Sequence, residues 1–539
     1  MEGERPNYRR IRIRNTCLTV DIKRSPSEAK MPTNSFRTQL EDPDAFAVTW
    51  ELVPGRGSWE DQQEALFTSA EQAKGDDRIA AISVTDNPGG EPAISPVEIA
   101  HELADDDIES LIHLTTRDEN RLGLESTLSG LERAGLHNLL VMSGDYPAGG
   151  DAGQAKAVYD LDSVQLLDLI DRMNAGELDL ENEFLPTNLF AGCVISPFKR
   201  LEAEVMTQYW KFEKKVAHGA SFAIPQLGYD MRKFHELLQF VEEQELEISV
   251  LGNVYVPSSG LARMIHRGDL PGATMPDALL ERINDDQSRR DRLERAAKRF
   301  AVFRGMGFDG VHLGGHGLTY EDVAFVIDRS EQFQSEWKNV LDDVHYPMDD
   351  GWYLYEEDEQ SGLNTPTRRD LGPAGRPGLH YRTFELAHDE LFDPDGRLFD
   401  LMYTITNRMD DTVLEGPLHA AERVGKSATL GCEDCGDCAI FDLGYLCPMS
   451  QCPKHERNGP CGGGMDGMCE VYPDTQECVY VRAYERYKAA GGTEKAREHL
   501  RDTYVAPPDR ALDGSSSWLN YYAGRDTASQ RAGIDPKES

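Results

Sequence analysis

Eight short apolar stretches, each followed by a segment of helical character, recur between residues 45 and 320 and constrain the fold more than any other feature of this chain. Apolar runs of about 4 to 8 residues are typical of buried strands, and their alternation with amphipathic segments indicates a parallel sheet. Eight such units predict an α/β fold, a closed TIM (β/α)8 barrel. The expected strands are Phe46–Leu52, Ile79–Val84, Ser110–Leu114, Asn138–Met142, Asn188–Ile195, Ser221–Gln226, Glu247–Leu251 and Gly310–Gly314.

A doubly wound open sheet is the alternative arrangement for such units. A nicotinamide-binding sheet of that kind carries G-x-G-x-x-G after its first strand, and this chain does not, so a Rossmann domain is not indicated. After about residue 330 the alternation gives way to acidic, aromatic and then Pro/Gly/Arg-rich sequence. We therefore expect an N-terminal extension (1–44), the barrel (45–330), a connector (331–430), a smaller cysteine-rich metal or iron–sulfur domain (431–505) and a polar, frayed tail (506–539).

The charge of the chain excludes some partners. The 95 Asp and Glu residues outnumber the 56 Lys and Arg residues, which gives a net charge of -39 at pH 7. Such a surface repels phosphate backbones, so nucleic acid is a poor partner. Because the acidic residues are spread along the chain, we interpret them as a halophilic surface suited to high salt, with an acidic protein from a low-salt organism as the alternative.

The apolar segments are too short for a membrane span. A spanning helix needs about 20 apolar residues, and no stretch approaches that length. The first residues, MEGERPNYRRIRIR, are not followed by the apolar run of a signal peptide. We expect a cytoplasmic protein with no membrane span.

Eight of the ten cysteines fall between residues 432 and 478, in the spacing C-x2-C-x2-C-x8-C-x4-C-x8-C-x7-C-x8-C. In a large chain without an export signal, this clustering favours metal ligation over disulfides. Eight thiolates suffice for two four-cysteine sites, and C-x2-C-x2-C favours [4Fe-4S] clusters, with zinc as the alternative. The spacing does not show how the ligands divide between sites, and His455 is a conceivable extra ligand. The expected ligands are Cys432, Cys435, Cys438, Cys447, Cys452, Cys461, Cys469 and Cys478.

Polar residues lie at or just after the C-terminal ends of the first four expected strands. Catalytic groups of a parallel barrel come from the C-terminal ends of its strands, where this chain has Glu51, Thr85, His113 and Asp145. We expect burial to raise the pKa of Glu51 and so suit it to act as a general acid near neutrality. Taken singly, each residue also has an ordinary structural explanation as a cap partner, a core histidine or a turn residue.

Taken in order, the segments FAVTWELVPGRG, SVTDN, IHLTT, SGDYP, KKVAHGASFAIPQLGYD and GFDGVHLGG resemble the methylenetetrahydrofolate reductase family over residues 34–330. The resemblance implies a flavin, FAD or FMN, across the barrel mouth. It also implies reduction of 5,10-methylenetetrahydrofolate to 5-methyltetrahydrofolate in one-carbon metabolism, the step that supplies methyl groups for methionine biosynthesis. The oligomeric state is left open, and a homo-oligomer is one option.

The resemblance also assigns residues. Glu51 would protonate N10 of the folate, Asp145 would lie near the flavin and the pterin, and Gln226 would bind the folate. The chain departs from the family at Ser143, where bacterial members have Arg, and at Gln208 and Lys211, which replace two polar flavin contacts and leave the choice between FAD and FMN open. The implied flavin contacts are Thr85, His113, Ser143, Gly144, Asp145 and Lys215.

The cysteine-rich segment resembles the C-terminal domain attached to reductases of this family, which is associated with iron–sulfur or zinc binding. A cluster there would feed electrons to the flavin, so the donor would be NAD(P)H or a ferredoxin-like protein. The alternative function is an electron-transfer or methyl-transfer partner whose barrel does not turn over folate. A nucleic-acid zinc finger is disfavoured by the acidic surroundings.

Overall fold

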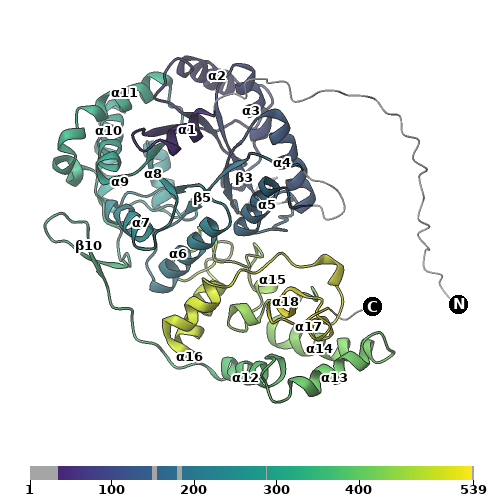
Figure 1. Ribbon diagram of the computed structural model, residues 1–539. Coiled ribbons are helices and arrows are strands. Elements are labelled where there is room, and N and C mark those ends of the chain that lie inside the picture. Colours follow the sequence, from purple (N-terminus) through teal and green to yellow (C-terminus); the bar gives the residue numbers. More distant parts are fainter. Residues whose placement is uncertain (1–33, 148–153, 179–184, 287, 537–539) are drawn as a thin grey trace, which may run out of the picture. The chain divides into compact units, whose positions relative to one another are not determined.

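The eight predicted strands form a closed parallel barrel in chain order, with β1 hydrogen-bonded to both β2 and β8 (Figure 1). This confirms the predicted (β/α)8 fold. The structure, a computed structural model, describes residues 34–147, 154–178, 185–286 and 288–536. The strands are β1 (Ala47–Leu52), β2 (Ala81–Val84), β3 (Ser110–Thr115), β4 (Asn138–Met142), β5 (Phe190–Ile195), β6 (Phe222–Pro225), β7 (Ser249–Tyr255) and β8 (Gly310–Gly314).

Helices surround the strands (Figure 1). Aspartate side chains cap two of them: Asp162 accepts from the first backbone N–H groups of α5, and Asp230 accepts from those of α7. The helices are α2 (Asp61–Ala73), α3 (Pro96–Asp105), α4 (Arg121–Ala134), α5 (Ser163–Ala175), α6 (Glu202–Ala217), α7 (Met231–Glu243), α8 (Ser259–His266), α9 (Asp277–Asp285), α10 (Arg289–Met306) and α11 (Tyr320–Glu331).

Alternation along the strands divides the barrel into an outer apolar face and an inner one. On β1, Val48, Trp50 and Leu52 belong to the large core shared with the helices, whereas Ala47 belongs to the inner cluster. The inner cluster fills the N-terminal end of the barrel, where Phe36 of α1 (Ser35–Glu41) packs edge-on against Phe222. Apolar packing therefore closes this end, and polar interior residues lie towards the other.

Strand β7 differs from its prediction, because it runs to Tyr255 rather than ending at Leu251. Asn253 and Tyr255 interrupt the apolar run, which hid the strand's second half from an argument based on hydrophobicity. Both residues pair in register with β8.

Beyond the barrel, β9 (Tyr355–Glu357) and β10 (Asn364–Arg368) form a two-stranded antiparallel sheet. Helix α16 is interrupted at Gly491 and Gly492, whose backbone angles are not helical, so it consists of two helical segments. The expected frayed tail is wrong for its described part, since Tyr521 and Tyr522 are buried in a cluster with Phe399. The five domain boundaries stay predictions. The helices here are α12 (Leu379–Ala387), α13 (Phe399–Met409), α14 (Glu415–Leu430), α15 (Pro448–Gln451), α16 (Val479–Leu500), α17 (Ser517–Tyr522) and α18 (Thr527–Arg531).

None of the helices in the described part of the chain combines the length and the apolar character needed to cross a bilayer.

Candidate active site and cysteine sites

Two hydroxyl–imidazole pairs lie inside the barrel between the apolar plug and the C-terminal mouth. Thr49 Oγ1 is 2.8 Å from His312 Nδ1, and Ser83 Oγ is 2.8 Å from His113 Nε2. Both rings are buried. Such a pairing fixes the orientation of each imidazole and leaves its second nitrogen for another group.

Glu51 lies beside these rings. Its Oε2 is 3.3 Å from His312 Nε2, and ligand-capable atoms of Glu51, His113 and His312 all lie within 4.8 Å of one another. Burial favours the protonated form of Glu51, but the hydrogen bond and charge of His312, helped by His113, outweigh burial and lower the pKa. The expected rise in pKa is therefore wrong, because the sequence argument included the burial and not the histidine. Burial lowers the pKa of His113 to about 4, which keeps that ring neutral near pH 7.

The segment after β4 forms a second polar group at the mouth. Gly144 has φ of 81°, and a Cβ there would lie 2.9 Å from Thr115 Cβ, so the position requires glycine. Asp145 Oδ2 accepts from Gly89 N at 2.8 Å. Burial raises the pKa of Asp145, and the Glu470 carboxylate adds to the rise while Lys454 opposes it.

The remaining predicted residues have separate surroundings. Thr85 is buried, and its Oγ1 has no hydrogen-bond partner in the described part of the chain. Lys215 on α6 donates to the Val194 carbonyl at 2.7 Å, and burial lowers its pKa to about 8. Gln226 Oε1 accepts from the backbone of Leu227. Among the described residues, no hydrogen bond or ion pair joins Lys215 or Gln226 to Glu51, so their expected roles stay predictions.

The cysteine-rich module contacts the barrel at the positions where the sequence departs from the family. Lys211 Nζ is 2.6 Å from Glu456 Oε2, and both side chains are almost fully buried. Ser143 Oγ donates to the other oxygen of Glu456, and Gln208 Nε2 donates to the Cys461 carbonyl at 2.7 Å. The three departures are thus explained by contacts with residues 456–461 of the module.

The loop between Cys452 and Cys461 is held by further contacts. Lys454 Nζ donates to the Gly144 carbonyl at 2.8 Å, and Asp162 Oδ2 accepts from Asn458 Nδ2 at 2.9 Å. Gly459 approaches so closely that a Cβ there would lie 2.5 Å from Lys211 Cβ. The loop is therefore packed on the barrel beside β4 and α6.

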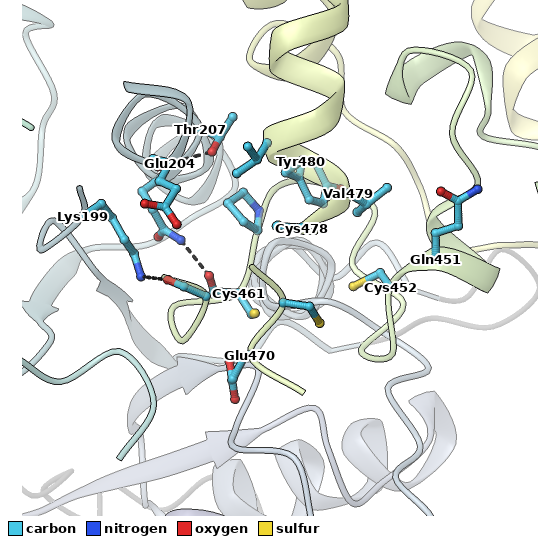
Figure 2. Close-up of a pocket in the computed structure, with 15 residues that line it drawn as sticks. Lys199, Glu204, Thr207, Gln451, Cys452, Cys461, Glu470, Cys478, Val479 and Tyr480 are labelled. Atoms are coloured by element: carbon cyan, nitrogen blue, oxygen red, sulfur yellow. Dashed lines mark hydrogen bonds between the residues drawn. The ribbon is translucent and has the colours of Figure 1, made fainter. Parts of the chain in front are cut away.

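The eight cysteines divide between two cavities, in sequence order. The outer site is bordered by Cys432, Cys435, Cys438 and Cys447. All the other residues that line it also lie between 426 and 449. The barrel-facing site is bordered by Cys452, Cys461, Cys469 and Cys478, together with Lys199, Glu204, Thr207 and Gln208 of the barrel. Figure 2 shows Glu204 and Thr207 of α6 and Cys478 at the start of α16 around this second cavity.

The sulfur spacing limits what these sites can hold. Among the described residues, no three cysteine sulfurs lie within 4.8 Å of one another. Four thiolates around one tetrahedral zinc, with Zn–S bonds of about 2.3 Å, have sulfurs about 3.8 Å apart. His455 borders neither cavity.

The methylenetetrahydrofolate reductase family matches residues 36–313, which is more than half of the chain. The chain belongs to this family. Residues 412–504 match a second family, described as the C terminal of methylene-tetrahydrofolate reductase. The expected family of both parts is therefore confirmed.

Individual relatives are distant. Methylenetetrahydrofolate reductase 2 of Schizosaccharomyces pombe is 22% identical over 340 residues, which cover 59% of this chain and 49% of that protein. The match thus spans about half the length of this curated relative. A solved Clostridium thermocellum protein that binds two copies of 5-methyl-5,6,7,8-tetrahydrofolic acid is 12% identical, with a TM-score of 0.41 over 56% of this chain and 98% of that one.

Sequence reasoning missed two parts of the reductase-family site. His312 lies in the segment GFDGVHLGG, and its signal was a histidine at an inward-facing position of the last strand, in register with Thr49. Glu456 and Lys454 had no such signal, because only the folded chain places the cysteine loop on the barrel.

Proposed function

We propose that this protein reduces 5,10-methylenetetrahydrofolate to 5-methyltetrahydrofolate in the cytoplasm, by hydride transfer from a reduced flavin at the barrel mouth. The observation that carries the proposal is the Glu51–His312 pair, with its histidine buried, at the C-terminal end of a reductase-family barrel. A carboxyl group in contact with an imidazole can take up and deliver a proton where the strands end.

The residues at the mouth fit a flavin. Thr85 offers a buried hydroxyl without a partner in the described part of the chain, and the polar edge of a flavin would pair with it. The flavin, once reduced, supplies the hydride that the methylene carbon accepts. Because Ser143, Gln208 and Lys211 are bonded to the module, the flavin, FAD or FMN, would be held by other residues of the mouth.

Glu51 would supply the acid chemistry. Opening the five-membered folate ring requires a proton on N10, and the carboxyl group of Glu51 delivers it only when it is protonated. His312 contacts Glu51 through Nε2 and is the adjacent group able to pass a proton to it. Thr49 on Nδ1 holds the ring in place for this transfer.

Replacing His312 by Leu is expected to move the pH midpoint of the folate half-reaction upwards by about one unit or more. The rate falls as the pH rises through the Glu51 pKa, and His312 lowers that pKa. Without His312, burial raises the pKa of Glu51, so the rate falls at a higher pH. The measurement is single-turnover flavin reoxidation between pH 5 and 9. An unchanged midpoint would mean that the fall of the rate at high pH reflects the titration of a group other than Glu51.

The proposed function is tested by an anaerobic titration in high salt. Adding methylenetetrahydrofolate to the reduced protein should reoxidise the bound flavin and form 5-methyltetrahydrofolate, and denaturation should release FAD or FMN. Protein that binds flavin but ignores the folate would contradict the proposal and favour an electron- or methyl-transfer partner. Protein without flavin would contradict it as well.

The cysteine sites are proposed to hold [4Fe-4S] clusters. Their sulfurs are spread more widely than one zinc requires, and each cavity has four thiolates. Cations compensate the anionic ligands: Lys426 Nζ is 3.7 Å from Cys438 Sγ, and Lys199 borders the barrel-facing site. Clusters favour a ferredoxin-like donor over direct reduction by NAD(P)H.

A further inference from the structure

A cavity of about 360 Å³ lies where a loop of the barrel meets the cysteine-rich module. Its volume is within the range of about 300–1,000 Å³ that is typical of small-molecule sites. Residues between 265 and 276, at the end of α8 and in the loop to α9, form one wall, and residues between 463 and 473 of the module form another. The two walls touch, because a Cβ at Gly272 would lie 2.7 Å from the Gly462 carbonyl oxygen. Both parts of the chain therefore build this cavity.

The cavity adjoins the barrel mouth on two sides. Glu470 borders it, and Lys454 bonds both to the Glu470 carboxylate and to the Gly144 carbonyl after β4. On the other side, Met275 packs in one apolar cluster with Leu227, in the segment that follows β6. A molecule bound at the mouth, between the ends of β4 and β6, can therefore extend into the cavity.

The lining suits an aromatic ring that carries carboxylates. Thioether groups pack favourably against aromatic rings, and four methionines line the cavity. Two arginines also border it, and a guanidinium group is the best partner for a carboxylate. Arg200 Nη1 is 3.0 Å from Asp466 Oδ2, and Arg267 Nη2 is 2.5 Å from Asp269 Oδ2. Exposed pairs of this kind contribute little to stability, so a ligand carboxylate can replace the aspartate. The methionines are Met275, Met348, Met465 and Met468.

We propose that this cavity binds the p-aminobenzoylglutamate tail of the folate, so that the cysteine-rich module supplies one wall of the substrate site. The inference rests on the proposed function, which places the pterin at the barrel mouth. The methionines contact the benzoyl ring, and Arg200 and Arg267 bind the glutamyl carboxylates. On binding, Arg200 exchanges Asp466 of the module for a carboxylate of the ligand.

Equilibrium dialysis of the full chain with 5-methyltetrahydrofolate measures binding without turnover. The ligand is used with one and with three glutamyl residues, and as the pteroate analogue that has none. Arg200→Ala and Arg267→Ala are each expected to weaken binding of the glutamylated ligands by about tenfold or more and to leave binding of the pteroate analogue unchanged. Arg263→Ala is the matched control, because Arg263 lies one turn earlier on α8 and does not border the cavity. It should bind all three ligands as the wild type does.

Asp466→Asn is expected to have the opposite effect. Asparagine tolerates the left-handed backbone at this position, where φ is 55°, and the substitution removes the charge that competes for Arg200. Binding of the glutamylated ligands should tighten several-fold, which local unfolding cannot produce.

Three results would each overturn the inference: equal wild-type affinity for the three ligands, arginine variants that bind like the wild type, or no gain in Asp466→Asn. Failure of the proposed function alone would show differently. Binding would then keep its dependence on the two arginines, while methylenetetrahydrofolate would not reoxidise the reduced flavin. Wild-type protein that binds none of the three ligands would overturn both.

Discussion

Glu51→Gln is expected to lower the rate of methylenetetrahydrofolate reduction by about 10²- to 10⁴-fold while leaving flavin bound. Glutamine keeps the shape and can still accept a hydrogen bond from His312, but it cannot deliver a proton to N10. The loss should appear in the folate half-reaction alone, because reduction of the flavin by its donor does not need this acid. Stopped-flow measurement of the two half-reactions separates them.

Glu109→Gln is the matched control. Glu109 precedes β3, at the opposite end of the barrel, where it accepts from Asn138 Nδ2 at 2.5 Å and where burial raises its pKa to about 7. The same substitution there should leave both half-reactions unchanged. Near wild-type folate turnover in Glu51→Gln would remove Glu51 from the acid role and with it the main support for the proposed reaction.

Lys211→Met is expected to destabilise the protein by about 3–5 kcal/mol, because it leaves Glu456 charged and buried without its cation. Burial would lower the pKa of Lys211, but the Glu456 carboxylate outweighs it and raises that pKa, so the pair is ionic. The measurement is the urea midpoint of the anaerobically purified protein. Proteolysis between the barrel and the module should increase as well.

The controls separate burial from charge. Arg37→Met breaks the exposed pair with Glu41 and should cost less than about 1 kcal/mol. The double variant Lys211→Met, Glu456→Met removes both charges and should recover most of the loss. A double variant as unstable as Lys211→Met would show that packing, rather than the unpaired carboxylate, causes the effect.

The barrel was predictable because its signal is local. Each strand is a short apolar run, as Ser110–Thr115 is, and the register follows once eight such runs close into a ring. The prediction ended strand β7 too early, at Leu251, because the polar residues Asn253 and Tyr255 interrupt its apolar run. A hydrophobic pattern predicts strands poorly at the mouth of the barrel, where polar residues are needed for function.

The site was predictable only in part. Glu51 and His113 were found because strand ends of a parallel barrel share one mouth, and the structure does bring them together. The predicted direction of the Glu51 pKa shift was wrong, because the shift depends on His312, which is 261 residues away in the chain. Likewise, how eight cysteines divide between two sites is a matter of three-dimensional folding that spacing does not encode.

Because Ser143, Gln208 and Lys211 of the barrel bind residues of the module, substitutions in one part constrain those that the other part tolerates. A change of charge at Glu456 calls for a change at Lys211, and an Arg in place of Ser143 would bring a second cation and a longer side chain against the same carboxylate. We therefore expect that replacing the barrel or the module alone with that of a relative would break these contacts. We also expect residues 143–211 and 454–461 to covary among relatives that carry both parts.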